Sequence, residues 1–231
     1  MKILGLDSSG LVASVAIVED DNLRGEFTMN YKKTHSQTLL PMLDEVVRMI
    51  ELDLHTIDAI AVSAGPGSFT GLRIGSATAK GLGLALDKPL IHIPTVDALA
   101  YNLYGHKDVI CPIMDARRNQ TYTGLYRFVE NIMQIIEPQC VVGIDEIVNK
   151  INEQGEPVVF LGDGVKVFQT FIEENVKVPF SFAPAHVNKQ RAAAVATLGE
   201  IYYQEGKTED AKDHKPDYLR LSQAERERLE R

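Results

Sequence analysis

The sequence predicts an α/β fold built from two copies of one structural unit, and three observations support this. Both halves of the chain show the same order of elements: three strands, a helix, a strand, a glycine-containing loop and a helix. An aspartate, Asp7 or Asp115, closes the first strand of each half. A Gly-x-Gly loop follows the fourth strand of each half, at residues 65–67 and 162–164. The pattern therefore indicates an internal duplication.

Two such units facing each other form the duplicated ribonuclease-H-like architecture of the actin, sugar-kinase and Hsp70 group, with two mixed-sheet subdomains. In that group a nucleotide lies in the cleft, and turns at the strand ends hold its phosphates. We expect an N-terminal subdomain over residues 1–104, joined by the C-terminal segment of about residues 206–231. The second subdomain is expected over residues 105–205.

Apolar patterning assigns the elements of the first half in order. Short or alternating apolar runs between turn residues predict strands, and apolar residues three and four apart predict helices. The expected strands are 3–6, 12–18, 25–31, 58–63 and 90–93, and the expected helices are 36–52 and 68–86. Thr34 and Gln37 could form a capping box at the first helix. Pro41, however, fits better in the first turn of a helix capped by Thr38.

The second half is assigned by the same patterns. The expected strands are 109–114, 121–128, 132–136 and 157–161, and the expected helices are 145–153 and a stretch that ends near residue 174. An alanine-rich helix is expected over 188–204. The tail from Ala211 mixes six basic with five acidic residues. For this tail we expect a solvated terminal helix that frays.

Composition excludes several classes of function. The 231 residues carry 24 Lys and Arg against 32 Asp and Glu, a net charge of −8. The chain therefore lacks the basic field that sequence-independent nucleic-acid binding needs, and an RNA partner would be reached through a local patch or another subunit. The N-terminus has no signal-peptide core, and no apolar run approaches the length of a membrane span. These features predict a cytoplasmic protein without membrane contact.

Two segments are candidates for binding a nucleotide. Asp7, Ser8 and Ser9 follow a strand, and an aspartate beside hydroxyls can position Mg²⁺ and bind a phosphate, although plain turns share this pattern. Gly65 and Gly67 lie between a strand and a helix N-terminus, where backbone N–H groups can bind an anion. This loop is neither a Walker A loop nor a dinucleotide fingerprint. A tight turn that needs glycine for its dihedral angles remains the alternative.

The second predicted helix, at 68–86, carries a face of small residues. Gly71, Gly75 and Ala79 lie four apart on one side of it. Glycine costs about 1 kcal/mol relative to alanine in a helix interior, so this face needs a compensating reason. Close approach by another helix supplies one. That helix could belong to this chain or to a partner subunit.

Residue spacing speaks against a metal site and against a serine hydrolase. No two histidines lie three or four residues apart, the spacing that places two imidazoles on one helical face. The six histidines are at positions 35, 55, 92, 106, 186 and 214. No Gly-x-Ser-x-Gly elbow occurs. We therefore expect no metal site, although spacing alone leaves open the convergence of distant histidines in the fold.

Several motifs together resemble those of a known family. Residues 3–9 read Ile-Leu-Gly-Leu-Asp-Ser-Ser, and residues 35–41 read His-Ser-Gln-Thr-Leu-Leu-Pro. The glycine-rich run at 64–75 reads Ala-Gly-Pro-Gly-Ser-Phe-Thr-Gly-Leu-Arg-Ile-Gly. Asp-Ala-Arg-Arg at 115–118 and Pro-Asp-Tyr-Leu-Arg at 216–220 complete the set. In order and over essentially the whole chain, these motifs resemble the TsaB family of bacterial tRNA threonylcarbamoyladenosine biosynthesis proteins, once grouped with glycoproteases.

The resemblance implies a helper subunit with no catalytic residue of its own. The catalytic paralogue in this family, TsaD, transfers a threonylcarbamoyl group from its adenylate to an adenosine beside the tRNA anticodon. TsaD carries a His-x-x-x-His metal pair shortly after the strand that matches residues 90–93. Thr95 and Leu99 occupy those positions here, and neither holds a metal as imidazole does. The implied partners are TsaD, a TsaE-type ATPase and, through the complex, tRNA.

Two alternatives accompany this interpretation. An autonomous nucleotide-dependent phosphotransferase of the same fold is motivated by Asp7 and the glycine loops, and a peptidase comes last. For the leading interpretation we expect no tightly bound cofactor, and ATP or ADP bound only weakly or at the interface of the complex. The residues of this remnant nucleotide cleft are Asp7, Ser8, Ser9, Gly65 and Gly67.

The expected partner interface lies on the first two helices. After His35, Leu39 and Leu43 belong to one apolar row and Leu40 and Val47 to another, whereas a helix packed on one sheet needs a single stripe. One row would face the core. The other row, with the small face of the next helix, would bind TsaD, or a second copy of this chain when TsaD is absent. The predicted interface set is His35, Leu39, Leu40, Leu43, Val47, Gly71, Leu72, Gly75 and Ala79.

Overall fold

The first half of the chain forms a five-stranded mixed sheet. The computed structural model describes residues 1–31 and 34–220. The strand order is β3-β2-β1-β4-β5, with β1 antiparallel to β2 and parallel to β4. The strands are β1 (Lys2–Asp7), β2 (Val12–Glu19), β3 (Asn22–Asn30), β4 (Ala59–Gly65) and β5 (Leu90–Pro94).

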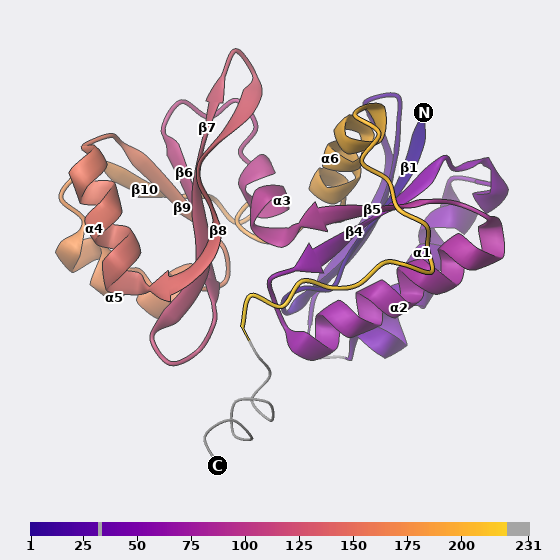
Figure 1. Cartoon of the computed structure of the whole chain (residues 1–231), viewed down its shortest axis with the longest axis horizontal. Helices are drawn as coiled ribbons and strands as arrows, with labels where there is room; N and C mark the ends of the chain where they lie inside the picture. The colour runs from indigo at the N-terminus through magenta and orange to yellow at the C-terminus, as the bar shows by residue number, and fades with distance from the viewer. Residues whose placement is uncertain (32–33, 221–231) are drawn as a thin grey trace.

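The second half repeats this topology. The order β8-β7-β6-β9-β10 matches the first sheet position for position, with β6 antiparallel to β7 and parallel to β9. The strands are β6 (Val109–Asp115), β7 (Gln120–Val129), β8 (Ile132–Gly143), β9 (Val158–Leu161) and β10 (Phe180–Phe182). The structure thus confirms the predicted duplicated α/β fold of the ribonuclease-H-like type. Figure 1 shows the two sheets in two lobes.

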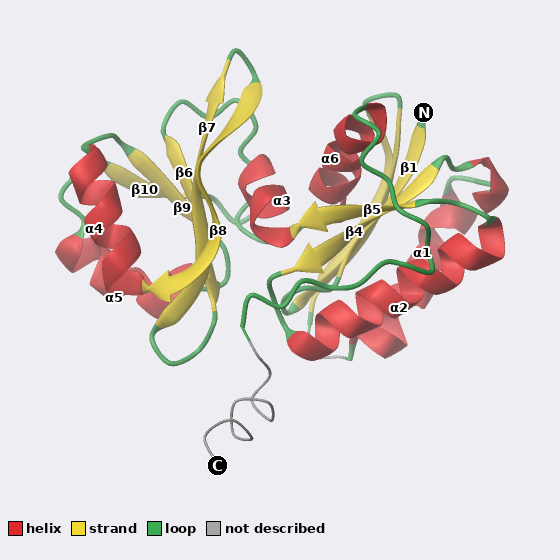
Figure 2. Ribbon diagram, viewed as in Figure 1, coloured by secondary structure: helices red, strands yellow, loops and turns green. Residues whose placement is uncertain are grey.

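Two helices cover the outer face of each sheet (Figure 2). On the first sheet these are α1 (His35–Met49) and α2 (Phe69–Leu86), and on the second α4 (Ile144–Gln154) and α5 (Val165–Asn175). A short 3-10 helix, η1 (Leu54–Thr56), precedes β4. No helix within the described residues combines the length and the apolar character needed to cross a membrane.

The two sheets exchange the helices that cover their inner faces. Helix α3 (Thr95–Tyr101) ends the first half, yet Val96 and Leu99 pack in a core cluster with residues of the second sheet. Helix α6 (Ala192–Gln204) ends the second half, yet it packs across β1, β2 and β4 of the first sheet. The predicted subdomain boundary at residue 205 therefore assigns α6 to the wrong lobe. The apolar inner face of the first sheet needs a covering layer, and α6 supplies it.

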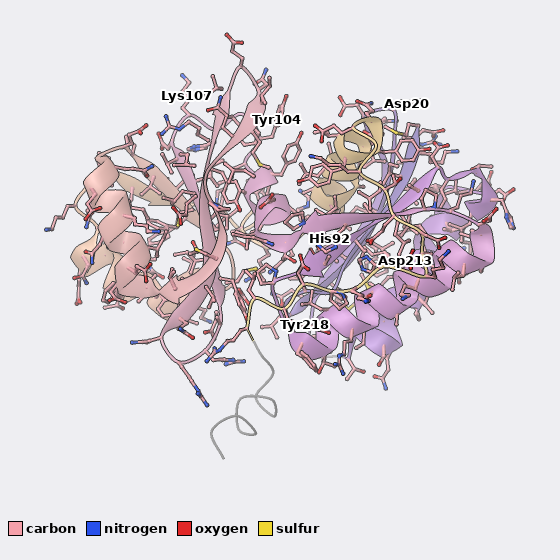
Figure 3. All side chains as sticks on the ribbon, in the orientation of Figure 1. Asp20, His92, Tyr104, Lys107, Asp213 and Tyr218 are labelled. Carbon is pink, nitrogen blue, oxygen red and sulfur yellow. The ribbon has the colours of Figure 1, made fainter. Side chains whose placement is uncertain are left out.

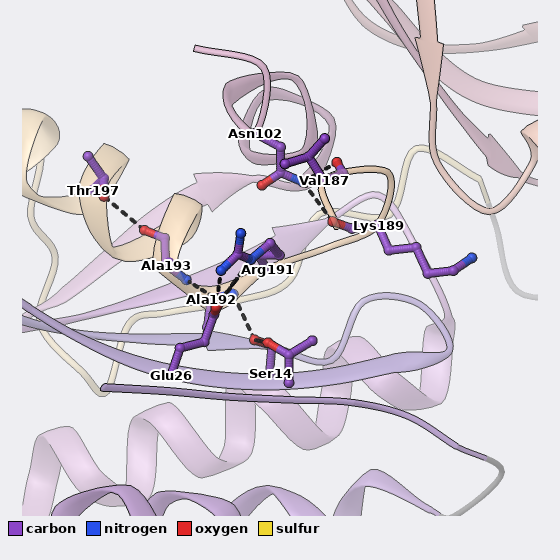
Figure 4. Close-up of polar contacts among 10 residues, drawn as sticks. Ser14, Glu26, Asn102, Val187, Lys189, Arg191, Ala192, Ala193 and Thr197 are labelled. Atoms are coloured by element: carbon purple, nitrogen blue, oxygen red, sulfur yellow. Dashed lines mark hydrogen bonds and ion pairs between the residues drawn. The ribbon is translucent and has the colours of Figure 1, made fainter. Parts of the chain in front are cut away.

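Polar contacts hold the start of α6 on the first sheet (Figure 4). The Ala192 N–H donates to Ser14 Oγ at 2.8 Å, and the Ala193 N–H donates to the Glu26 carboxylate at 3.2 Å. Arg191 forms an ion pair with the same Glu26. These contacts satisfy N–H groups that the helix leaves unpaired and place a negative charge at the positive end of its dipole. Strands of the first lobe thus cap a helix that follows the second.

Helix α1 begins about a turn earlier than the preferred prediction. It starts at His35, whose Nε2 contacts the Gly10 carbonyl oxygen at 2.8 Å, and this contact holds the first turn against the β1–β2 turn. Pro41 lies inside the helix, so the predicted Thr38 cap is wrong. The N-cap residue is Thr34, without a side-chain capping bond, so the capping box does not form either.

Three elements have no counterpart among the predictions, namely η1, α3 and β10. Residues 95–100 of α3 are all buried, so the helix shows no amphipathic period. Strand β10 has only three residues. Two boundaries differ from the predicted ranges by four residues or more: β8 continues to Gly143, and α6 begins at Ala192.

Residues 206–220, here called the C-terminal strap, run back across the first lobe (Figure 1). The backbone of Glu209 exchanges two hydrogen bonds of 2.9 Å with Leu90 of β5. The side chain of His214 is buried. The predicted fraying helix from Ala211 is therefore wrong up to residue 220, because the strap packs as an extended segment. The rest of that prediction, 221–231, lies outside the described residues.

The packing of α6 on β1 predicts the effect of adding one methyl group at Gly5. A Cβ there would lie 2.4 Å from the Ala192 carbonyl oxygen, a backbone atom that cannot move alone. We expect Gly5→Ala to lower the free energy of unfolding by about 1–3 kcal/mol, as overpacking does. In the matched control Gly81→Ala, a Cβ would meet nothing within 4 Å on the exposed face of α2. In that variant the free energy of unfolding, measured with urea, should rise by about 0.5–1 kcal/mol. If the two substitutions changed this free energy equally, the packing described would be wrong.

Candidate functional site

A cavity of about 370 Å³ lies between the two lobes. This volume falls at the small end of ligand pockets, which span roughly 300–1,000 Å³. Turns at the strand ends of both lobes and the end of the strap form its wall. Lining residues used below are Ser9, Gly67, Ser68 and Phe69 of the first lobe, Asp115, Arg117, Arg118 and Asp163 of the second, and Asp217, Tyr218 and Arg220 of the strap.

The turn after β1 is buried and hydrogen-bonded within the first lobe. Asp7 accepts hydrogen bonds from the Ser9 N–H at 2.9 Å, from Ser9 Oγ at 2.7 Å and from Ser63 Oγ. Burial raises the pKa of Asp7, and these hydrogen bonds oppose the rise. Ser8 Oγ donates to the Gly71 carbonyl oxygen at 2.9 Å. Both carboxylate oxygens of Asp7 thus have protein partners, and Asp7 and Ser8 are not among the residues that line the cavity.

The glycines of the loop after β4 and of α2 form the surface on which the β1–β2 turn packs. A Cβ on Gly67 would lie 2.3 Å from the Ser9 carbonyl oxygen, and one on Gly71 would lie 2.0 Å from that of Ser8. A Cβ on Gly75 would lie 2.5 Å from Ser8 Oγ. The small-residue face of α2 therefore permits close approach, as predicted. The neighbour, however, is the chain's own β1–β2 turn rather than a helix.

Only part of the predicted nucleotide-binding set reaches the cavity. Ser9 and Gly67 border it. Gly65 faces the strap, where a Cβ would lie 2.2 Å from the Asp217 carbonyl oxygen. The Ser68 N–H, at the helix terminus where an anion would bind, donates to the Ser9 carbonyl oxygen at 2.6 Å. The glycine loop thus fits its alternative interpretation, a tight structural turn.

The strap closes the cavity beside the start of α2. The Tyr218 ring packs on Phe69 with the ring centroids 4.9 Å apart, and the Tyr218 hydroxyl accepts a hydrogen bond from Arg73 Nε at 3.1 Å. The Arg73 guanidinium lies 4.0 Å from the Phe69 centroid, within cation–π range. Arg220 donates to the Ala116 carbonyl oxygen of the second lobe. The strap therefore links the two lobes at the cavity, and Figure 3 labels Tyr218 there.

The second lobe contributes charged groups from the ends of β6 and β9. Asp115 accepts the Arg117 N–H at 2.8 Å. Asp163 Oδ1 is buried without a hydrogen-bond partner among the described residues, and burial raises the pKa of this carboxyl. Arg117, Arg118 and Asn119 all have positive φ and are exposed. The cavity thus presents both signs of charge.

The cavity does not match the site of a serine or cysteine hydrolase. Its described lining residues include no histidine, cysteine or lysine. Its two serines are held within the first lobe, Ser9 by Asp7 and Ser68 by the Gly71 N–H. A nucleophile of this kind needs an adjacent base and access to substrate. The arrangement can admit a small polar ligand without a group placed to attack it.

The chain is similar over its whole length to known proteins. The family model for TsaD, tRNA N6-adenosine threonylcarbamoyltransferase, matches residues 23–228. The tRNA threonylcarbamoyladenosine biosynthesis protein TsaB of Bacillus subtilis is 31% identical over 230 residues, which cover 100% of this chain and 99% of the relative. TsaB of Haemophilus influenzae is also 31% identical, over 95% of this chain and 94% of its own length. The chain belongs to the TsaB family.

The fold agrees with that of a solved structure, YeaZ from Pseudomonas aeruginosa. The TM-score is 0.79 at 24% identity, covering 94% of this chain and 99% of that one. The likeness extends across both lobes. With the family established, the predicted role in tRNA threonylcarbamoyladenosine biosynthesis is confirmed for this TsaB-family chain.

In this TsaB-family chain, the two positions matched to the metal pair of TsaD belong to the protein core. Thr95 and Leu99 lie one turn apart on α3, and both side chains are buried. Thr95 Oγ1 accepts a hydrogen bond from the Gly65 N–H at 3.1 Å, and Leu99 packs in the core cluster of the second sheet. Neither side chain faces the cavity. Thr95 is thus bonded to the end of β4 in the first lobe, and Leu99 is packed on the second.

The predicted TsaB-type interface set is largely inside the first lobe. Six of its nine members are buried, because they fill the core under α1 or pack against the turn after β1. For these six the prediction of partner contact is wrong. These six are Leu39, Leu43, Gly71, Leu72, Gly75 and Ala79. Leu40 is 51% exposed, and His35 and Val47 are half-buried. Only these three remain available to a partner.

Sequence reasoning missed two contributors to the cavity wall, Asp163 and the strap. The sequence signals present are the Gly-x-Gly loop at 162–164 and the family motif at 216–220. Neither segment shows the apolar periodicity of a helix or strand, so the sequence does not indicate where it lies in the fold. Proximity between 216–220 and the loop after β4 arises only when the strap folds back.

The hydrogen-bonded β1–β2 turn and its packing on the glycines of α2 predict weak nucleotide binding by the isolated chain. The Asp7 carboxylate and the Ser68 N–H already have partners, so a phosphate or Mg²⁺ would have to displace them. We expect calorimetry to show no sub-micromolar ATP binding and no steady hydrolysis. Tight binding with turnover by the isolated chain would favour the phosphotransferase alternative instead.

Proposed function

We propose that this chain is a non-catalytic scaffold subunit that binds and activates a TsaD-type enzyme during threonylcarbamoyl transfer to tRNA. A TsaE-type ATPase and the tRNA join through the complex, and ATP or ADP binds weakly or at its interface. The net charge of −8 leaves contact with the RNA backbone to the partners. A second copy of the chain occupies the same surface when the TsaD-type partner is absent.

The burial of Thr95 and Leu99 is the observation that carries this proposal. At the positions matched to the imidazole pair, the chain has a hydroxyl bonded to the backbone and an aliphatic side chain in the core. Histidines at positions 95 and 99 would place two polar rings in a packed interior. A chain of this family without that pair needs a partner to supply the chemistry.

The outward faces of α1 and α2 offer a surface for that partner. Leu40 on α1 is 51% exposed and Leu84 on α2 is 62% exposed. On α2 the small residues Ala77 and Gly81 are also exposed, so another helix could approach closely. Figure 1 shows the two helices as neighbours, on the face of the sheet opposite α6. Exposed apolar residues grouped on two adjacent helices are typical of an interaction surface.

This surface predicts which substitutions abolish association. In Leu40→Glu and Leu84→Glu, a charge would have to be buried against the partner. We expect each variant to bind the TsaD-type protein of the same organism at least about a hundredfold more weakly, the effect of losing an interface anchor worth roughly 2–3 kcal/mol. Surface plasmon resonance measures this affinity, and sedimentation of the isolated chain tests the homodimer.

The matched control is Val167→Glu on α5. Val167 is 59% exposed, close to Leu84, but lies on the second lobe. This variant should bind like the unaltered chain, and all three should unfold at similar urea concentrations. If the α1 and α2 variants bound their partner with undiminished affinity, the surface would be assigned to the wrong helices.

A further inference from the structure

The strap brings together three side chains of metal-ligating type beside β5. His92 lies on β5, whereas Glu209 and His214 lie on the strap. One potential ligand atom from each lies within 4.8 Å of the other two. More than a hundred residues of chain separate His92 from the other two, so helical spacing could not reveal the cluster. Figure 3 labels His92 together with Asp213 and Tyr218 of the strap.

Backbone contacts hold the strap at this place independently of the cluster. Glu209 and Leu90 exchange two backbone hydrogen bonds of 2.9 Å, two residues before His92 on the same strand. On the other side, Lys80 Nζ of α2 donates to the carbonyl oxygens of Lys212 at 2.8 Å and of His214 at 3.2 Å. The three ligand-type side chains are therefore presented by segments that are already anchored. Such preorganisation lowers the cost of binding an ion.

His214 has an unsatisfied nitrogen at this cluster. Its side chain is fully buried, and Nδ1 lies 2.5 Å from Glu209 Oε1. Nε2 is also buried and has no hydrogen-bond partner among the described residues. The His92 ring lies close by, with the two ring centroids 5.7 Å apart. A buried imidazole nitrogen without a partner is uncommon in proteins and calls for a ligand or an ordered water.

We propose that His92, Glu209 and His214 bind one divalent transition-metal ion of the zinc class and thereby clasp the strap to β5. Two imidazoles and one carboxylate form a set that such ions favour over Mg²⁺ or Ca²⁺. Bonds of roughly 2.0–2.2 Å place the ligand atoms of a tetrahedral ion about 3.5 Å apart, so the three side chains must rotate from their present positions to bind it. The lone pair of His214 Nε2 is free to bind the ion while the ring proton stays on Nδ1, facing Glu209, so binding at Nε2 releases no proton.

Asp217 supports one of the ligands from outside the set. Its Oδ2 lies 2.9 Å from Nε2 of His92. A carboxylate on a ligating imidazole orients the ring and selects its tautomer. Asp217 also begins the part of the strap that lines the cavity between the lobes. The ion would therefore stiffen the segment that forms one wall of that cavity, a role separate from the partner surface on α1 and α2.

The test uses the full chain, prepared without a polyhistidine tag and stripped with a chelator. Titration with Zn²⁺ in a calorimeter gives the stoichiometry, and titration with Co²⁺ reports ligand geometry through its visible absorption. We expect one ion per chain and a Zn²⁺-dependent rise in the unfolding temperature. His92→Gln, Glu209→Gln and His214→Gln should each weaken binding at least about tenfold, more than Asp217→Asn.

Two control variants separate this site from chance binding by surface groups. His55→Gln removes an exposed histidine of η1, and Glu174→Gln removes an exposed carboxylate of α5. Both should bind Zn²⁺ like the unaltered chain. His92→Gln decides the outcome if the buried His214→Gln fails to fold. The proposal is wrong if the unaltered chain shows no saturable binding, or if His92→Gln binds as tightly as the controls.

Discussion

The exchange of α3 and α6 between the two sheets is the constraint on which the rest of the structure depends. Each sheet has two apolar faces, and the helices of its own half cover only the outer one. The inner face of the first sheet is closed by Val195 and Leu198 of α6, and that of the second by Val96 and Leu99 of α3. Neither half therefore completes its core alone. The lobes stay together, and the cavity between them has walls contributed by both.

Several glycines of the first lobe allow backbone segments to pack in direct contact. The β1–β2 turn lies so close to α2 that a side chain on Gly67 or Gly71 would collide with backbone oxygens. The same approach engages the Ser68 N–H, and Ser9 and Ser63 engage both oxygens of Asp7. These are the groups expected to bind phosphate or metal. The strap then covers Gly65. A strand-end loop that has the pattern of a nucleotide site thus serves to join segments, as expected for the helper role proposed above.

The sequence predicted the duplication, the strand order along the chain and most element types, because these follow from local periodicity. It could not predict the exchange of α3 and α6, since apolar spacing shows that a face is buried but not which sheet covers it. The small face of α2 correctly indicated close approach, but the expected neighbour was another helix and the observed one is the β1–β2 turn. The strap, the inward orientation of Gly75 and the meeting of His92 with His214 depend on contacts between distant segments. No single-segment pattern contains that information.

We infer that the chain serves tRNA threonylcarbamoyladenosine formation through a partner and not by its own chemistry. The most direct test is a reconstituted transfer reaction with threonylcarbamoyl adenylate and purified tRNA, in which the modified nucleoside is quantified by mass spectrometry. The reaction is run with this chain alone, with the TsaD-type enzyme alone and with both. We expect no product with the chain alone, and a rate at least about tenfold higher with both proteins than with the enzyme alone. Product formed by the chain alone, or an enzyme indifferent to its presence, would contradict it.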